Sequence, residues 1–422
     1  MKHLLVVNLF FAPRSFGGAT IVAEEVARRV AASGEWRVSV LSFSGFGDVA
    51  EPTLIRTRLP GGVDHYTLNF GGDRTPDQEF DNPAMTRAAR ALIAEIAPDA
   101  AHAHCIQGLG AGVIDALEAE GVPILLSTHD YWWICEKIFM LNHLGVYCRQ
   151  EEIDLKICGR CVYDSSGLQA RWDKSLATLR KPAVITYPSR YARLQHERNG
   201  APAERGFVLA NGVTPPGPDY AAKRAARTSK RLRFGYIGGP GPLKGWAMIE
   251  RAFRTLDPEA AELVVVDAAT HLGASWWSEY RFGPLERHVT VVPGYTMATV
   301  DDFFAGIDVL LFLSTWKETF GLTSREAALR GVHVIATDCG APIEPLIDGD
   351  TATILKGFGS ASSLRRAMKR LVAEGPPTPS DAGREKIAAE IQSYDHQAAE
   401  VMRILGEITA SAPSAPRSSS SE

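Results

Sequence analysis

The feature that most constrains this sequence is an alternation of short apolar runs with helical stretches, which occurs in two successive series. Alternation of this kind predicts parallel strands joined by helices, and therefore a doubly wound α/β sheet. A turn-rich segment, Thr214-Pro215-Pro216-Gly217-Pro218, separates the two series. The chain of 422 residues is also too long for one ordinary core. The sequence therefore predicts two doubly wound α/β domains that face each other across a cleft.

The apolar runs give the expected strands and, with them, the domain boundaries. In the first series we expect strands at Leu4–Val7, Arg37–Leu41, Ala100–His104, Ile124–Ser127, Val184–Thr186 and Phe207–Leu209. In the second series we expect them at Arg233–Ile237, Leu263–Val266, Val289–Val292, Val309–Leu313 and Val334–Ala336. The expected parts are a first α/β domain (1–213), a linker (214–230), a second α/β domain (231–390), a C-terminal helix packing back on the first domain (391–410) and a disordered tail (411–422).

Charge and hydropathy exclude several classes of partner. The 45 Lys and Arg residues against 49 Asp and Glu residues give a net charge of −4, so no basic excess indicates nucleic acid. No run approaches the roughly 18 apolar residues of a membrane span. The apolar start of the chain is interrupted by Asn8 and has no small-x-small cleavage site, so it is interpreted as a buried strand. A cytoplasmic protein is expected.

Four of the six cysteines lie close together in the sequence, at Cys135, Cys148, Cys158 and Cys161. A disulfide framework is not expected in a large cytoplasmic chain. The Cys-x2-Cys pair suits a tetrahedral zinc, and four thiolates would fix a long loop. The alternative is four reduced cysteines in a mobile loop. We therefore expect either a structural zinc or no metal here.

The segment from Ser314 to Glu326 is the richest in candidate binding groups. It follows the expected strand Val309–Leu313 and leads into a short helix, whose first N–H groups and dipole favour a phosphate. Glu318 and Glu326 supply carboxylates that can accept hydrogen bonds from the hydroxyls of a sugar or a ribose. The alternative is a purely structural role, in which Thr323 and Glu326 form a capping box that requires no ligand.

A second candidate loop runs from Phe234 to Gly245, where a strand enters a glycine-rich turn. Gly238 and Gly239 allow the backbone to approach a ligand closely, and Lys244 can neutralise phosphate charge. The turn lacks the Gly-Lys-Ser/Thr of a P-loop and the dinucleotide fingerprint. The alternative is a surface lysine beside an ordinary turn.

These two loops together resemble the donor-site signature of retaining GT-B glycosyltransferases of group 1, or family 4. The resemblance includes two glutamates with seven residues between them, around Phe320-Gly321, the segment Glu326 to Asp338, and Pro345-Leu346-Ile347-Asp348-Gly349. Two positions differ: His333 stands where proline is usual and Ala341 where glycine is usual. The resemblance implies the GT-B fold, two Rossmann-like domains facing across a cleft.

The resemblance also implies roles for individual residues on the donor side. Glu326 would bind the ribose of a UDP- or GDP-linked sugar, and Glu318 would bind the hydroxyls of that sugar. Backbone N–H groups at Phe320, Gly321 and Leu322 would hold the diphosphate or the sugar. Lys244 would stabilise the leaving diphosphate. The family usually has an arginine at the position of Gly239, so one of its two diphosphate cations is absent here.

In the first domain the resemblance points to three further places. Gly17-Gly18 would lie near the diphosphate or the acceptor, although a tight turn explains the pair equally well. His129, in a His-Asp pair after Ile124–Ser127, would point at the donor sugar. His104 matches a second family histidine on the acceptor side. A Cys-rich insert after the His-Asp motif is similar to one carried by many bacterial members.

The expected reaction moves a sugar, with retention, to a hydroxyl of a glycan or lipid-linked acceptor in cell-surface polysaccharide or glycoconjugate synthesis. A retaining enzyme can use a carboxylate nucleophile, but none is assigned in these motifs. The family's alternative is front-face departure and attack, with no catalytic cofactor and no catalytic metal. Other readings remain: a nucleotide-sugar epimerase, a nucleotide-dependent oxidoreductase or an inactive binding subunit.

Two basic stretches bear on membrane association. Residues 223–233 carry six basic and no acidic residues, and residues 171–205 carry eight Lys or Arg against three Asp or Glu. The second stretch is interpreted either as a solvated helix face, which is favoured, or as a surface for an anionic membrane. The latter would place the protein at the inner face of the plasma membrane.

Overall fold

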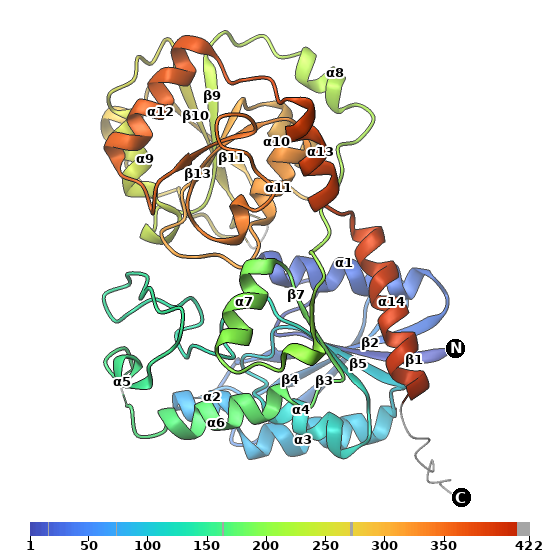
Figure 1. Cartoon of the computed structure of the whole chain (residues 1–422). Helices are drawn as coiled ribbons and strands as arrows, with labels where there is room; N and C mark the ends of the chain where they lie inside the picture. The colour runs from blue at the N-terminus through green and yellow to red at the C-terminus, as the bar shows by residue number, and fades with distance from the viewer. Residues whose placement is uncertain (16, 73, 163, 271–272, 412–422) are drawn as a thin grey trace, which may run out of the picture. The chain divides into compact units, whose positions relative to one another are not determined.

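The computed structural model describes residues 1–411, except 16, 73, 163, 271 and 272. The chain divides into two compact units, each built on its own sheet (Figure 1). Unit 1 comprises residues 1–143, 149–211 and the C-terminal residues from Tyr394, and unit 2 comprises 144–148 and 212–393. The expected tail, apart from Ser411, lies outside the described residues.

Unit 1 contains an eight-stranded sheet in the order β3-β4-β2-β1-β5-β6-β7-β8. Its strands are β1 (Lys2–Val7), β2 (Trp36–Ser44), β3 (Thr53–Arg58), β4 (Asp64–Asn69), β5 (Ala100–Ala103), β6 (Ile124–Ser127), β7 (Val184–Tyr187) and β8 (Gly206–Val208). Its helices are α1 (Gly18–Ala32), α2 (Pro76–Phe80), α3 (Pro83–Ile96), α4 (Gly112–Ala119), α5 (Leu155–Cys158), α6 (Leu168–Leu179), α7 (Arg190–Arg198) and α14 (Tyr394–Ser411). All neighbouring strands are parallel except β3 and β4.

Unit 2 contains a six-stranded parallel sheet in the order β11-β10-β9-β12-β13-β14. Its strands are β9 (Leu232–Ile237), β10 (Ala261–Asp267), β11 (Val289–Pro293), β12 (Val309–Phe312), β13 (His333–Thr337) and β14 (Ala352–Leu355). Its α-helices are α8 (Tyr220–Ala225), α9 (Trp246–Phe253), α10 (Val300–Ala305), α11 (Leu322–Leu329), α12 (Ala361–Glu374) and α13 (Asp381–Glu390). The prediction of two doubly wound α/β sheets is confirmed.

The strand order places a topological switch point in each sheet. In unit 2 the chain moves outward from β9 through β10 to β11, then returns to β12 on the other side of β9. In unit 1 the corresponding neighbours are β1 and β5. Ligands of open α/β sheets bind outside the carboxyl ends of the strands at such points. The loops after β1, β5, β9 and β12 are therefore the first places to search.

Buried apolar strands and amphipathic helices form the cores. In unit 2, a continuous cluster joins the strands to α9 and α12, and includes Phe234, Ile249, Val265, Leu311 and Met368, each less than 3% exposed. Strands β10, β12 and β13 are buried along their whole length, which is typical of a parallel sheet covered by helices. This close packing holds the carboxyl-end loops in fixed positions.

The C-terminal helix α14 lies alongside α1 within unit 1 (Figure 1). The Arg29 guanidinium binds the Asp395 carboxylate at 2.6 Å, and the Arg29 side chain also lies over the Tyr394 ring. Apolar residues of α14, among them Val401, Ile404 and Leu405, are buried. Because Tyr394 follows directly on unit 2, the chain returns from unit 2 to unit 1 here.

Candidate functional site

The loop between β12 and α11 has the conformation needed to present a helix N-terminus. Gly321 is the N-cap of α11 with φ 77°, and a Cβ at this position would lie 2.6 Å from Pro342 Cγ. Both facts require glycine. No side chain caps the helix, and Thr323 lies inside it. The capping-box alternative is therefore wrong, and the helix N-terminus is presented through backbone N–H groups alone.

The loops after β9 and β12 bring two predicted residues into contact. The Lys244 ammonium lies 2.6 Å from Glu318 Oε1. The Glu318 side chain is 10% exposed and the Lys244 side chain 41% exposed. The backbone of Glu318 is held by the next loop, since its N–H donates to Cys339 O and its carbonyl accepts from the Ala341 N–H. A buried carboxylate and an accessible ammonium therefore meet at the switch point of unit 2.

Glu326, one turn into α11, is buried and contacts a residue that the motif analysis did not identify. The Tyr295 hydroxyl, just after β11, donates to Glu326 Oε2 at 3.2 Å. Burial raises the pKa of Glu326 to about 7, while the nearby Arg330 and the Tyr295 hydrogen bond oppose the shift. A carboxyl of this kind can ionise on binding a hydroxylated ligand. The sequence could have indicated Tyr295 only through its position just after the carboxyl end of the expected strand Val289–Val292.

Two buried arginines hold α11 in place. The Arg325 guanidinium lies 3.9 Å from the centroid of the Phe320 ring and donates to Phe320 O and Ala341 O. Arg330 pairs with Asp301 at 2.7 Å and has no exposed side-chain surface. Both residues act on the site through the backbone of α11 and its preceding loop. Sequence spacing carries no signal for them, because their partners come from distant segments.

The glycine turn after β9 is closely surrounded by side chains. A Cβ on Gly238 would lie 2.6 Å from the Tyr236 hydroxyl, which itself donates to Gly239 O at 3.0 Å. A Cβ on Gly239 would lie 3.2 Å from Trp276 Cε3. A side chain at either position would therefore crowd a neighbouring aromatic residue. The turn leads to Gly245, which has φ 77° and begins α9.

In unit 1, histidines gather at the carboxyl ends of β5 and β6. His104 Nδ1 and His129 Nε2 are 2.9 Å apart, so one of the two imidazoles donates to the other. Burial lowers the pKa of His129 to about 4 and that of His104 well below its usual value. The pair is therefore neutral at pH 7. His104 is only 3% exposed, which makes it a support for His129 more than a surface for an acceptor.

Asp130 and the neighbouring loops complete this part of unit 1. Asp130 Oδ2 accepts from Gln107 Nε2 at 2.8 Å, and Oδ1 accepts from the Trp132 N–H at 2.9 Å. Burial raises the pKa of Asp130 to about 6. Across the switch point, Asn8 Oδ1 accepts from the Cys105 N–H at 3.1 Å. These contacts order the loops that carry His104 and His129.

Gly17 and Gly18 begin α1, in the loop after β1. Gly17 is the N-cap with φ 83°, and no side chain caps the helix. A Cβ on either glycine would meet no atom within 4 Å, so the constraint at Gly17 is its backbone conformation. The structure thus brings together Lys244 with Glu318 in unit 2, and His104 with His129 in unit 1.

The expected cysteine cluster does not form a metal site in the described part of the chain. No group of three or more His, Cys, Asp or Glu residues there could hold a metal ion. Cys135, Cys158 and Cys161 belong to unit 1, whereas Cys148 belongs to unit 2. Gln150 Nε2 donates to Cys158 Sγ at 3.5 Å. The four thiols as arranged do not fit a tetrahedral zinc.

The basic stretches are largely neutralised within their own units. In residues 223–233, Lys223 pairs with Asp302, Arg227 with Asp308, and Arg231 with Glu262. In residues 171–205, Lys181 pairs with Asp115 and Glu118, and Arg193 with Glu197. No helix of the described residues is long and apolar enough to cross a membrane. These contacts favour solvated, internally paired surfaces.

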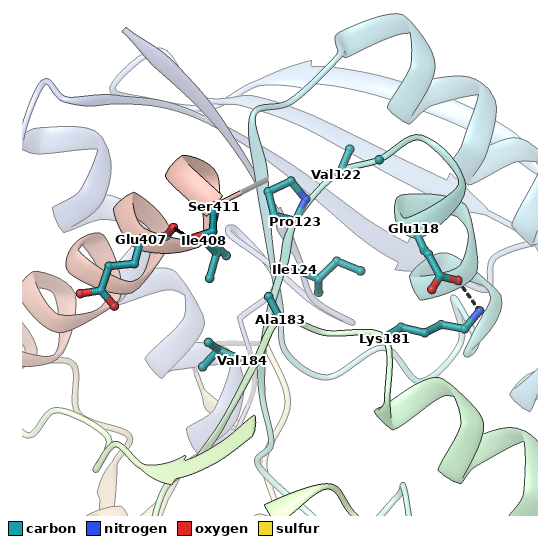
Figure 2. A pocket seen from close by; sticks show the side chains of 11 residues that line it. Glu118, Val122, Pro123, Ile124, Lys181, Ala183, Val184, Glu407, Ile408 and Ser411 are labelled. Atoms are coloured by element: carbon teal, nitrogen blue, oxygen red, sulfur yellow. Dashed lines mark hydrogen bonds and ion pairs between the residues drawn. The ribbon is translucent and has the colours of Figure 1, made fainter. Parts of the chain in front are cut away.

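A pocket of about 540 Å³ in unit 1 lies away from these loops. It is lined by the residues that precede and begin β6 and β7 and by the end of α14, including Ile124, Val184 and Ile408. Figure 2 shows the ion pair between Glu118 and Lys181, which are 2.7 Å apart, on its wall. The pocket is at the amino ends of the strands, opposite the edge that binds ligands in such sheets. It is therefore separate from the candidate site.

Solved structures with two similar Rossmann-like domains define the class of fold. Sucrose-phosphate synthase from Thermosynechococcus elongatus is similar over 97% of this chain and 100% of its own, with a TM-score of 0.68 and 16% identity. HepE from Anabaena, solved in complex with UDP, matches 96% of this chain and 100% of its own, with a TM-score of 0.62 and 16% identity. The fold is GT-B, like that of sucrose-phosphate synthase.

Two family models together match most of the sequence. The model described as Glycosyltransferase Family 4 matches residues 16–216, and the model described as Glycosyl transferases group 1 matches residues 223–388. The chain belongs to these retaining GT-B glycosyltransferases. D-inositol 3-phosphate glycosyltransferase from Stackebrandtia nassauensis is 28% identical over 212 residues. That match spans 46% of this chain and about half (47%) of the relative.

Proposed function

We propose that this protein transfers a sugar, with retention, from a UDP- or GDP-linked donor to a hydroxyl of a glycan or lipid-linked acceptor. The observation that carries the proposal is the pairing of Lys244 with Glu318 at the switch point of unit 2, beside the uncapped N-terminus of α11. A cation and oriented N–H groups suit a diphosphate, and the buried carboxylate suits sugar hydroxyls. HepE, solved in complex with UDP, supports a uridine donor.

The proposed roles follow the arrangement of unit 2. Glu326 would accept hydrogen bonds from the ribose hydroxyls, which would replace that from Tyr295. The Lys244 ammonium would move partly from Glu318 to the diphosphate. The Glu318 carboxylate would then be able to accept hydrogen bonds from the sugar. Gly238 and Gly239, with the N–H groups of Phe320, Gly321 and Leu322, would surround the phosphates. The carboxylates of Glu318 and Glu326 are buried before the donor arrives, which limits the reorganisation needed on their side.

In the reaction, the bond from the anomeric carbon to the β-phosphate oxygen breaks and a bond to the acceptor oxygen forms on the same face. Because the acceptor attacks on the face from which the phosphate departs, no carboxylate nucleophile is required. The acceptor proton passes to the departing phosphate oxygen, so no carboxylate base is required either. Negative charge develops on the diphosphate as it leaves, and Lys244 and the α11 N-terminus stabilise it. His129, which is neutral at pH 7, would form a hydrogen bond with the sugar. His104 would orient the imidazole of His129 through the hydrogen bond between the two rings.

The cellular setting is part of the same proposal. Synthesis of a cell-surface polysaccharide or glycoconjugate on the cytoplasmic side would give access to nucleotide sugars and to lipid-linked acceptors. Association with the membrane would be peripheral and electrostatic. Liposomes containing anionic lipid test this point. Binding at low salt that is lost at high salt supports it, and no binding at low salt contradicts it.

Donor hydrolysis and transfer, measured over a panel of UDP- and GDP-sugars, test the reaction. We expect one donor class to be consumed, the product to keep the anomeric configuration, and Glu326→Ala to abolish most of the activity. Glu374→Gln, at an exposed position on α12, is the matched control and should behave as the wild type. An epimerised donor would indicate the alternative enzyme, and donor binding without turnover an inactive subunit. If no nucleotide sugar binds, the proposal fails.

A further inference from the structure

An exposed tryptophan lies directly against the glycine turn of unit 2. An ideal Cβ on Gly239 would be 3.2 Å from Cε3, 3.3 Å from Cδ2 and 3.6 Å from Cγ of the Trp276 indole. Trp276 is nevertheless 36% exposed. A single exposed aromatic residue is common on protein surfaces and proves nothing by itself. Trp276 differs from such residues because it lies against the proposed phosphate-binding turn and because its backbone is held in place.

The backbone of Trp276 is tied to the end of β10. Asp267, the last residue of that strand, accepts from the Trp276 N–H at 3.1 Å and from the Ser275 hydroxyl. The next residue, Trp277, is buried and donates from Nε1 to Val266 O at 3.3 Å. Its ring centroid lies 4.7 Å from that of Trp246. One indole therefore anchors the segment in the core while its neighbour stays in contact with solvent.

Such a residue is suited to binding an aromatic ligand. A planar side chain with few rotatable bonds, held on a fixed backbone, loses little conformational entropy when it stacks. Gly239 complements the ring, because any larger side chain would press on the indole. The absence of the usual family arginine at Gly239 thus coincides with an aromatic surface in the space beside it.

The sheet order places Trp276 where a donor nucleoside would pass. The strands run β11-β10-β9-β12, and their carboxyl ends carry Tyr295, Trp276, Lys244 and Glu318 in that order. With neighbouring strands ~4.8 Å apart, the four ends cover about 14 Å. A sugar at Glu318 and a diphosphate at Lys244 leave the nucleoside to extend toward β10 and β11. Tyr295 contacts the proposed ribose ligand Glu326, so it is already on that side.

We propose that Trp276 is the platform on which the nucleobase of the donor stacks. The inference rests on the proposed nucleotide-sugar specificity and identifies a binding residue that the motifs do not contain. Every base has a π face, so stacking supports binding of uracil or guanine alike. Trp276 therefore sets the affinity for the nucleoside, while hydrogen-bonding groups around it select the base.

Calorimetric titration of the full chain with UDP, GDP and inorganic pyrophosphate tests the proposal. We expect Trp276→Ala to weaken binding of the preferred nucleotide about tenfold or more, the scale measured for base–aromatic stacking. Trp276→Phe should retain most of the affinity. Pyrophosphate has no base, so any affinity for it should not change. The matched control is Val291→Ala, an exposed apolar position on neighbouring β11, which should leave nucleotide binding unchanged.

A second variant addresses the contact with the turn. Gly239→Leu should displace the indole and weaken nucleotide binding in the wild type, but cause less loss when Trp276 is already alanine. If the wild type binds UDP or GDP and Trp276→Ala binds equally well, the stacking inference is overturned and the proposed function stands. Equal losses for pyrophosphate and nucleotide would also overturn it. If the wild type binds no nucleoside diphosphate, both proposals fall.

Discussion

The two switch points of the molecule differ in charge. At the switch point of unit 2, an ammonium and a carboxylate, Lys244 and Glu318, meet beside a helix N-terminus. At that of unit 1, two imidazoles, His104 and His129, are kept neutral by burial. The same topology therefore carries a pair of charged groups beside a helix N-terminus in one unit and an uncharged hydrogen-bonding pair in the other. This division suits a charged nucleotide on one side and neutral hydroxyl groups on the other.

The comparison is tested most strongly by removing the cation of unit 2. We expect Lys244→Met to lower the turnover number by about 10²–10³-fold, the cost of losing one preorganised charge-stabilising group. Steady-state transfer kinetics with the preferred donor measure this effect. Lys369→Met, at an exposed position on α12, provides the control. Unchanged turnover in Lys244→Met would mean that another group stabilises the leaving diphosphate.

The donor side can also be tested through the pH dependence of Glu326. Its pKa of about 7 means that ribose hydroxyls meet a carboxylate only above neutral pH. We expect affinity for UDP or GDP to rise by roughly tenfold from pH 6 to pH 8, since each pH unit below the pKa removes most of the ionised form. In Glu326→Gln this rise should disappear. Affinity that is independent of pH in the wild type would show that Glu326 does not bind as a carboxylate.

The same carboxyl affects stability in the opposite direction. Burial favours the protonated form in the folded state, so the native protein binds more protons than the unfolded chain between about pH 4.5 and 7. The free energy of unfolding should fall as pH rises through this window, by an amount on the order of 3 kcal/mol at about 1.4 kcal/mol per pKa unit. Denaturant unfolding of wild type and Glu326→Gln at pH 5 and pH 8 isolates this contribution. Equal pH slopes in the two proteins would contradict it.

For the histidine pair of unit 1 we expect a smaller effect. It tests whether His104 orients His129 or binds the donor itself. His104→Phe removes the hydrogen bond to His129 but keeps an aromatic ring, and we expect the turnover number to fall about 5- to 10-fold, as for one lost hydrogen bond. His104→Asn can still hydrogen-bond His129 and should restore part of the rate. The donor Kd should not change, because the proposed nucleotide ligands lie in unit 2. A change in donor Kd with normal turnover would instead make His104 a direct ligand.

The strands of the core could be predicted because periodic burial leaves a local pattern. Ile124–Ser127 matches β6 at both ends, and the other expected strands match to within two residues, except that β2 extends three residues beyond the expected end at Leu41. The antiparallel pair β3 and β4 escaped prediction because an edge strand alternates weakly: in β3, Thr53–Arg58, only Leu54 is partly buried. Strand β14, at the other sheet's edge, also lacks a long apolar run.

Some residues of the candidate site could be predicted from local sequence motifs, whereas others depend on tertiary contacts. Glu318, Lys244 and Gly321 were identified by motifs because their loop conformations depend on nearby residues. Tyr295 and Arg325 were missed, since their partners come from other strands and helices. For the cysteines, the sequence indicated a site that the described residues do not form. A Cys-x2-Cys spacing suits zinc, but it does not require the four thiols to come together. Neither His104's burial nor its contact with His129 could be read from the sequence, because both depend on the pairing of β5 with β6.

The smallest expected effect concerns the helix that returns to unit 1. Arg29 and Asp395 join α1 to α14 through an ion pair in which the Asp395 side chain is 83% exposed. Exposed pairs of this kind contribute ~0–1 kcal/mol, so Asp395→Asn should lower the free energy of unfolding by less than about 1 kcal/mol. Val401→Ala, at a fully buried position on the same helix, should cost more, about 1–3 kcal/mol.

Denaturant unfolding monitored by circular dichroism compares the two variants, and donor binding serves as the independent readout. Because α14 belongs to unit 1, both variants should leave nucleotide affinity in unit 2 unchanged. A larger loss in Asp395→Asn than in Val401→Ala would mean that charge, not apolar burial, holds the helix. A loss of nucleotide affinity in Val401→Ala would show that the packing of α14 affects the donor site, and the two units could no longer be treated as separate in their binding roles.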